Sequence, residues 1–112
     1  MHYYTHGRNG DFVVRSPLVL GHEASGIITA LGPDVEDSSS LLRVGQRVAL
    51  EVGIACKTCR YCVEMGNGTS FTCGPRYNLC ENMRFCSSAK TFPHLDGTLQ
   101  SRINHPAGLL HP

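Results

Sequence analysis

The sequence predicts a mainly β domain, and three features of it lead to that class. Residues 12–35 mix β-branched and apolar side chains, interrupted by prolines and glycines at intervals shorter than an ordinary helix. Residues 47–52 alternate in polarity, as strand residues do. Residues 56–92 show no clear period and are rich in Cys, Gly, Asn and Ser. We therefore expect short strands joined by turns, and no long helix.

The elements can be placed along the chain from these patterns. The SSS stretch at residues 38–40 is expected to be a surface loop. A turn at Val44-Gly45 should lead into a strand over Arg47 to Val52, with Val48 and Leu50 on one face. A second turn is expected at Asp96-Gly97, followed by a strand over Thr98 to Ile103. Something other than an apolar core should hold residues 56–92.

Composition and charge limit the class of protein. A chain of 112 residues is long enough for one ordinary domain, and its 41% hydrophobic and 17% charged residues fit a folded protein. The formal net charge of +1 gives no field to attract nucleic acid or an anionic membrane, so neither partner is expected. No apolar run is long enough to span a membrane and no signal-peptide pattern opens the chain. We expect a cytoplasmic protein.

The segment CKTCRYC, residues 56–62, places three cysteines two residues apart. Thiolates at this spacing can converge on one zinc ion, and a fourth cysteine from a later loop would close a structural site. Cys80, Cys86 and Cys73 are the candidates for the fourth ligand, and spacing alone does not choose among them. The alternatives are disulfides, including a secreted disulfide framework, and reduced thiols that only fill space. A redox CxxC pair normally begins a helix, which KTCRYC does not resemble.

A second pattern with chemistry begins at Gly21. A histidine followed by glutamate, as in His22-Glu23, is by itself most often a surface pair. Here the pattern G-H-E-x-x-G and the later G-x-x-V resemble the signature of the zinc alcohol dehydrogenases. Its matching positions are Gly21, His22, Glu23, Gly26, Gly32 and Val35.

Other stretches resemble the medium-chain zinc dehydrogenases, in particular their sorbitol, xylitol and L-arabinitol (polyol) branch. They are HYYTHGRNGDFVV, VGQRVALEVG, CKTCRYC, RYNLC, DGTL and NHPA. The resemblance implies that residues 1–112 form an N-terminal GroES-like domain, a partly open β-barrel with a structural-zinc lobe at about residues 53–92. It makes Cys80 the fourth ligand beside Cys56, Cys59 and Cys62.

The resemblance also implies an activity and a second metal. The family oxidises a secondary alcohol to a ketone with NAD, and a catalytic zinc acts as Lewis acid. His22 matches the zinc-binding histidine. Glu23 matches the neighbouring acid, which resembles a direct ligand in polyol enzymes and lies behind the metal in other branches. Tyr3 and Phe12 match positions that line the polyol pocket, although both could equally be core aromatics.

Several parts of the family pattern have no match in this sequence. The cysteine of a C-G-S-D motif would precede HYY, an acidic ligand in an E-P motif would follow Pro112, and no G-x-G-x-x-G marks a Rossmann domain for NAD. We therefore expect no turnover from this polypeptide alone, and a homo-oligomer only for a full-length protein. The alternative function is a non-catalytic, zinc-stapled structural or interaction domain.

The lobe also departs from the family in length. Seventeen residues separate Cys62 from Cys80, where about seven are usual between third and fourth ligands in the family. The ten additional residues are expected to form a surface loop, because closure entropy grows only slowly with loop length, or to be a gene-model artefact.

Overall fold

The computed structural model describes residues 2–36, 41–63 and 76–112. Its elements are α1 (His2–His6), β1 (Arg8–Asn9), β2 (Phe12–Val13), β3 (Ala24–Ile27), α2 (Pro33–Glu36), β4 (Arg47–Leu50), β5 (Gly53–Ile54), α3 (Arg60–Val63), η1 (Tyr77–Leu79), β6 (Arg84–Phe85), η2 (Ala107–Leu109) and β7 (Leu110–His111). Short strands predominate and no described helix exceeds five residues. The loop predicted at residues 38–40, Cys73 and most of the additional lobe residues lie outside the described ranges.

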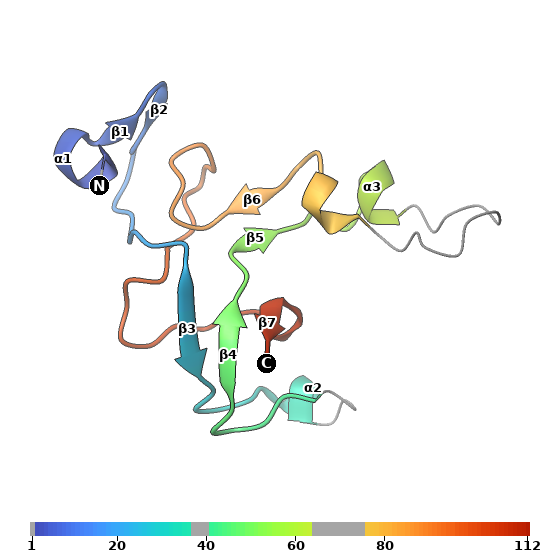
Figure 1. Cartoon of the computed structure of the whole chain (residues 1–112). Helices are drawn as coiled ribbons and strands as arrows, with labels where there is room; N and C mark the ends of the chain where they lie inside the picture. Colours follow the sequence, from blue (N-terminus) through green and yellow to red (C-terminus); the bar gives the residue numbers. More distant parts are fainter. Residues whose placement is uncertain (1, 37–40, 64–75) are drawn as a thin grey trace.

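The largest sheet has three strands in the order β3-β4-β7, all antiparallel (Figure 1). Its hairpin continues past β3, where the Ile28 N–H donates to the Gln46 carbonyl at 3.0 Å. The turn at Val44-Gly45 is present as predicted, with Gly45 at φ +87°, a conformation that favours glycine. Val48 is buried whereas its neighbours Arg47 and Ala49 are exposed, which confirms the predicted alternation.

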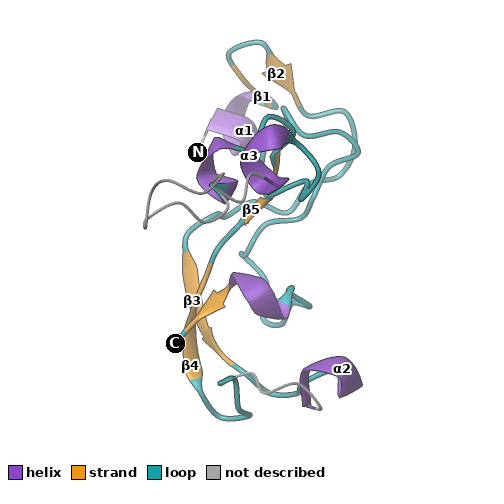
Figure 2. Ribbon diagram, turned by 90° about the vertical axis from the view of Figure 1, so that its right-hand side faces the viewer, coloured by secondary structure: helices purple, strands orange, loops and turns teal. Residues whose placement is uncertain are grey.

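Two shorter ribbons complete the strands. β1 and β2 form an antiparallel hairpin next to α1, and β5 pairs with β6 through Gly53 opposite Phe85. Figure 1 shows β5 continuing from the end of β4 toward α3, with β6 alongside it. Figure 2 shows the three-stranded sheet and α2 in one half of the molecule, and α1, α3 and the two ribbons in the other. The second half carries the cysteines.

The predicted turn and strand after residue 95 are wrong. Asp96-Gly97 is not a turn, and residues 98–103 are not a strand. The Asp96 carboxylate instead accepts a hydrogen bond from the Val19 N–H, and the N–H groups of residues 97–99 donate to the carbonyls of residues 19–21. This segment therefore satisfies its backbone by crossing another loop, and not by joining a ladder.

Two short helices, α2 and α3, are not among the elements expected from the sequence. α2 is one helical turn that begins at Pro33, a residue favoured at the first helical position because it lacks an N–H. α3 begins at Arg60, immediately after the second cysteine of CKTCRYC. The expectation that this motif does not begin a helix was wrong.

The apolar core is small. The buried apolar residues are Ile28, Val48, Val52, Cys62, Cys86 and Ala89, and no described side chain is less than 2% exposed. Large apolar side chains such as Leu41 (77% exposed) and Leu99 (72% exposed) face solvent. In the part of the chain that the structure describes, no helix has the length and apolar character to cross a bilayer.

Candidate metal centre

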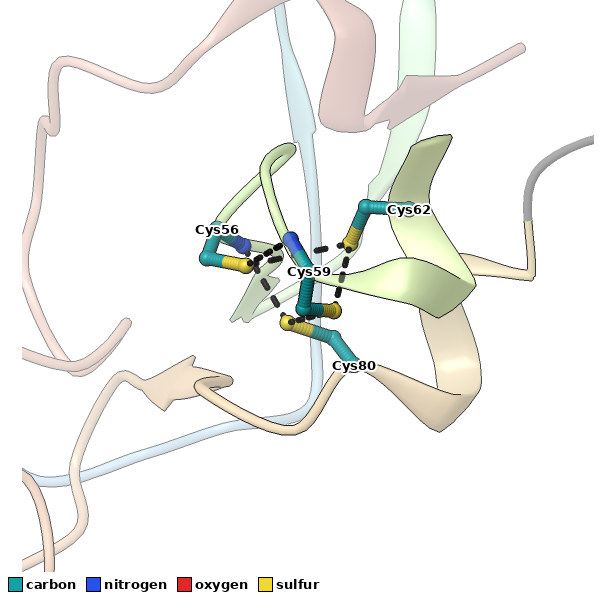
Figure 3. Close-up of side chains that lie close together, drawn as sticks. All are labelled: Cys56, Cys59, Cys62 and Cys80. Atoms are coloured by element: carbon teal, nitrogen blue, oxygen red, sulfur yellow. Dashed lines mark hydrogen bonds between the residues drawn. The ribbon is translucent and has the colours of Figure 1, made fainter. Parts of the chain in front are cut away.

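Four cysteines from separate parts of the chain converge in the lobe. Cys56 follows β5, Cys59 immediately precedes α3, Cys62 lies in α3, and Cys80 follows η1. The first helical turn explains the local geometry, because the N–H groups of Cys62 and Val63 both donate to the Cys59 carbonyl, at 2.9 and 3.0 Å. Figure 3 shows the four side chains directed at one another.

The sulfur positions fit a tetrahedral zinc ion. The Sγ–Sγ separations are 4.0 Å for Cys56–Cys62, 3.5 Å for Cys59–Cys62 and 4.0 Å for Cys59–Cys80, and all four sulfurs lie within 4.8 Å of one another. Four thiolates at about 2.3 Å from one zinc stand about 3.7 Å apart. A disulfide needs about 2.05 Å, and the five described cysteines are all unpaired. The set therefore has the spacing and donor chemistry of a closed Cys₄ site.

Hydrogen bonds to sulfur prepare the cluster for a metal. The Thr58 hydroxyl and N–H each donate to Cys56 Sγ at 3.5 Å, and the Cys59 N–H donates at 3.3 Å. These bonds, led by that of the Thr58 hydroxyl, lower the pKa of Cys56 to about 5. A hydrogen bond from the Glu81 N–H likewise lowers the pKa of Cys59. Because thiolates bind metals and thiols do not, both residues favour metal capture at neutral pH.

Burial acts in the opposite direction on two other cysteines. Cys62 is buried, and desolvation together with hydrogen bonding to the neighbouring thiols raises its pKa to about 12. Burial also raises the pKa of Cys86, which is not among the four converging residues. A bound cation would reverse the effect at Cys62, because a coordinated thiol loses its proton. In the described part of the chain, Cys86 belongs to no group of side chains that could hold a metal ion.

Contacts other than those between sulfur atoms also join the two segments of the lobe, the one around α3 and the one around η1. The Arg76 N–H donates to the Tyr61 carbonyl at 2.8 Å, which ties the segment before η1 to α3. The Arg60 guanidinium contacts the Glu81 carboxylate at 3.0 Å, in a largely exposed salt bridge. The Cys56 N–H donates to Cys80 Sγ at 3.2 Å. These contacts surround the cluster with the elements that carry it.

His22 and Glu23 lie together just before β3, and both are exposed. The His22 ring lies 5.9 Å from the Phe85 ring, centroid to centroid, at a 56° angle. Among the described residues, no group of three or more metal-binding side chains includes either of them. The described residues therefore bring no third metal-binding side chain to His22 and Glu23.

The two aromatic residues predicted to line a polyol pocket occupy different surroundings. Tyr3 in α1 is half-buried, and its hydroxyl oxygen accepts a hydrogen bond from the Ala89 N–H at 3.2 Å. Phe12 in β2 is 43% exposed, with Lys90 Nζ 5.9 Å from its ring centroid. Neither residue is part of the buried core, and both lie against the segment after Cys86.

A small β domain with a lobe of four converging cysteines has the arrangement of a domain whose segments a metal ion can cross-link. The whole chain, residues 1–112, matches the model of the alcohol dehydrogenase GroES-like domain. The chain belongs to this family, which confirms the resemblance seen in its sequence.

Individual relatives agree with this assignment. D-xylulose reductase A of Aspergillus oryzae is 43% identical over 99 residues, which cover 88% of this chain and 23% of that protein. A probable D-xylulose reductase A of Emericella nidulans is 43% identical over 106 residues, covering 95% and 24%. The crystal structure of L-idonate 5-dehydrogenase from Escherichia coli K-12 superposes with a TM-score of 0.75 at 34% identity, over 99% of this chain and 28% of that one. The mainly β, GroES-like fold class is thus confirmed, and the chain spans about a quarter of the length of these relatives.

Sequence patterns did not point to some residues that the site uses. Thr58 lies inside CKTCRYC and its hydroxyl contacts Cys56, and a polar residue within a CxxC loop is the only signal it gave. Phe85 gave none, because nothing in the sequence connects it with His22. Asp96 was assigned to a turn, and its bond to Val19 depends on tertiary structure.

Proposed function

We propose that this chain is the N-terminal catalytic-domain region of an NAD-dependent polyol dehydrogenase of the xylitol or sorbitol type. Its relatives are named as D-xylulose reductases and an L-idonate 5-dehydrogenase, and the family model covers the whole chain. In this reaction a hydride leaves the carbinol carbon for the nicotinamide and the hydroxyl proton is released. The products are a ketone, NADH and a proton. Reduction of a ketose is the same reaction in reverse.

The observation that carries the proposal is the convergence of four sulfurs within 4.8 Å. Cys56, Cys59, Cys62 and Cys80 would hold a structural zinc with no open position. When bound, zinc supplies a cross-link between segments that few apolar contacts join, and its binding free energy becomes folding free energy. The chain itself favours and orients the thiolate forms of Cys56 and Cys59, through the hydrogen bonds that their sulfur atoms accept.

In the intact enzyme, His22 and Glu23 would be ligands of a catalytic zinc, and Tyr3 and Phe12 would contact the polyol. Such a zinc, when bound, acts as Lewis acid toward an alcohol. The described residues do not complete that site, because no third donor joins His22 and Glu23. We therefore expect the 112-residue chain to bind one zinc and to leave NAD unreduced with xylitol or sorbitol.

The metal content of the purified chain tests the proposal. We expect one zinc per chain by elemental analysis, and loss of zinc together with folded structure after chelation, followed by circular dichroism. Cys80→Ser should abolish stoichiometric zinc. Cys86→Ser is the matched control, since Cys86 lies outside the four converging residues, and should keep one zinc. A folded, zinc-free wild-type chain would contradict the proposal.

A second candidate is a zinc-stapled domain without catalysis. The incomplete donor set around His22 favours it. A chimera separates the two, in which residues 1–112 replace the matching part of Aspergillus oryzae D-xylulose reductase A. Xylitol-dependent NAD reduction that His22→Ala removes would support the enzyme domain. A folded chimera with one zinc and no activity would support the second candidate.

A further inference from the structure

The segment that leads into His22 is held by one other stretch of chain, residues 96–99. Asp96 Oδ1 accepts from the Val19 N–H at 3.0 Å, and the Gly97 N–H donates to the Val19 carbonyl at 2.8 Å. The N–H groups of residues 98 and 99 donate to the carbonyls of residues 21 and 20, each at 2.9 Å. Four hydrogen bonds thus fix three consecutive residues immediately before His22. They do so across 77 positions of sequence.

Two glycines make this crossing possible. Gly21 has φ +99°, and a Cβ there would lie 2.9 Å from the Leu99 nitrogen and from Thr98 Oγ1. A Cβ on Gly97 would lie 2.6 Å from the Leu20 carbonyl carbon and closer still to the Gly21 oxygen. Real Cβ atoms do not approach backbone this closely, so the two loops touch only because both positions lack side chains. The crossing is a built feature of the fold.

The contact reaches His22 through a single peptide group. The Gly21 carbonyl that accepts from Thr98 belongs to the Gly21–His22 peptide, whose plane includes the His22 nitrogen. Fixing that oxygen fixes the direction in which His22 leaves the loop. Its ring then meets the Phe85 ring at 5.9 Å. Among the described residues, His22 has no side-chain hydrogen bond that could orient it instead.

We propose that Asp96 and Gly97 are positioning residues for His22: by holding Val19 they fix the loop whose Gly21 carbonyl accepts from Thr98, and so keep the imidazole against the Phe85 ring. The inference rests on the proposed function only in assigning the imidazole to a metal; the positioning itself is independent of that role. Gln100 supports the device, because its Nε2 donates to the Gly97 carbonyl at 2.8 Å.

The test follows the imidazole of His22 by ¹H–¹³C correlation spectra of the zinc-loaded chain, with His22→Gln identifying its peak. Phe85→Leu marks where the peak lies without the ring contact. Asp96→Ala should move the peak toward the Phe85→Leu position. It should also remove the nuclear Overhauser cross-peak between the His22 and Phe85 rings. Asp96→Asn keeps an oxygen acceptor for Val19 and should leave both at wild type. The peaks of His105 and His111, whose rings contact Glu51 and not the loop at residues 19–21, should not move in any variant.

A His22 peak that stays at wild type in Asp96→Ala, while the melting temperature falls, would show a purely structural contact and overturn the proposal. Should Asp96→Ala fail to fold, Gln100→Leu provides the same comparison with a milder change, and an unmoved peak there has the same meaning. A shift in Asp96→Asn equal to that in Asp96→Ala would also overturn it. The zinc stoichiometry of the wild-type chain tests the proposed function separately, because these spectra do not depend on a metal at His22.

Discussion

At the scale of single residues, the thiols of the lobe are unequal before any metal binds. Three donors hold Cys56 Sγ and lower its pKa to about 5, whereas burial raises the pKa of Cys62 to about 12. At pH 7 the first is therefore a thiolate and the second a thiol. Metal capture is expected to begin at Cys56 and to finish with proton loss from Cys62.

This difference predicts an order of chemical modification. Immediately after a chelator removes the metal at pH 7, and before the chain unfolds, iodoacetamide should label Cys56 several-fold faster than Cys62 or Cys86, because the thiolate is the nucleophile. Brief labelling followed by peptide mass spectrometry measures the rates. Thr58→Val removes the leading hydroxyl donor and should slow the labelling of Cys56 at pH 6. Equal rates at all three cysteines in wild type would contradict the assignment of charge.

A second residue-scale prediction concerns Gly21. Alanine there must adopt φ +99° and place its Cβ 2.9 Å from Leu99 backbone, so Gly21→Ala should destabilise the zinc-loaded chain by about 1–3 kcal/mol. Gly108→Ala is the matched control, because its Cβ would meet nothing within 4 Å, and should change stability by less than about 1 kcal/mol. Urea unfolding followed by circular dichroism measures both. Similar losses in the two variants would argue against the crossing described.

At the scale of elements, α3 and η1 are joined mainly through sulfur. Each contains a single short turn, too short to be stable alone. Their visible side-chain link, Arg60 to Glu81, is largely exposed and worth at most about 1 kcal/mol. A metal ion held by the four sulfurs would be the stronger link between them.

This ranking can be measured with two neighbouring substitutions. Glu81→Gln removes the salt bridge but keeps the N–H that donates to Cys59, so zinc affinity should stay within about threefold of wild type. Cys80→Ser, one residue away, should weaken binding by more than about tenfold. Competition with a chromogenic chelator gives both values. A larger effect for Glu81→Gln than for Cys80→Ser would reverse the assignment.

The sequence predicts the features that neighbouring residues decide, and it does not predict those that depend on tertiary contacts. Local signals placed the turn at residues 44–45, the alternation around Val48 and three cysteines of the cluster, because neighbouring residues decide those features. Family resemblance was needed to choose Cys80. The strand expected over residues 98–103 is absent because the N–H groups of residues 97–99 donate to the carbonyls of loop 19–21, which is far away in sequence. The sequence did not predict α3 because CKTCRYC carries no local helix signal, and its turn closes through hydrogen bonds to the Cys59 carbonyl.

At the scale of the whole molecule, the described chain buries few apolar side chains, and a groove lined by apolar and polar residues stays open beside the three-stranded sheet. Ile27, Leu50 and Ile103 are among its lining residues. Exposed apolar surface of this kind usually marks a place that another surface covers or a small apolar molecule enters. Because few apolar side chains are buried, the free energy of unfolding should depend on the lobe as much as on the three-stranded sheet.

The groove predicts dye binding by the native chain. Zinc-loaded protein should raise the fluorescence of anilinonaphthalene sulfonate, because apolar side chains line an accessible cleft. Ile27→Lys should reduce the signal without unfolding the chain, since Ile27 is 59% exposed and outside the core. Absence of fluorescence change with the folded wild type would show that the groove is closed in solution.

The hydrogen bond from Arg76 to Tyr61, next to the sulfur cluster, keeps both edges of the interval 64–75 at one place on the molecule. A foreign peptide inserted between Val63 and Arg76 would thus leave and rejoin the described chain at neighbouring points. A tag or fluorophore-acceptor peptide inserted between these residues should leave zinc binding intact. The lobe would then be a suitable place for labelling this domain.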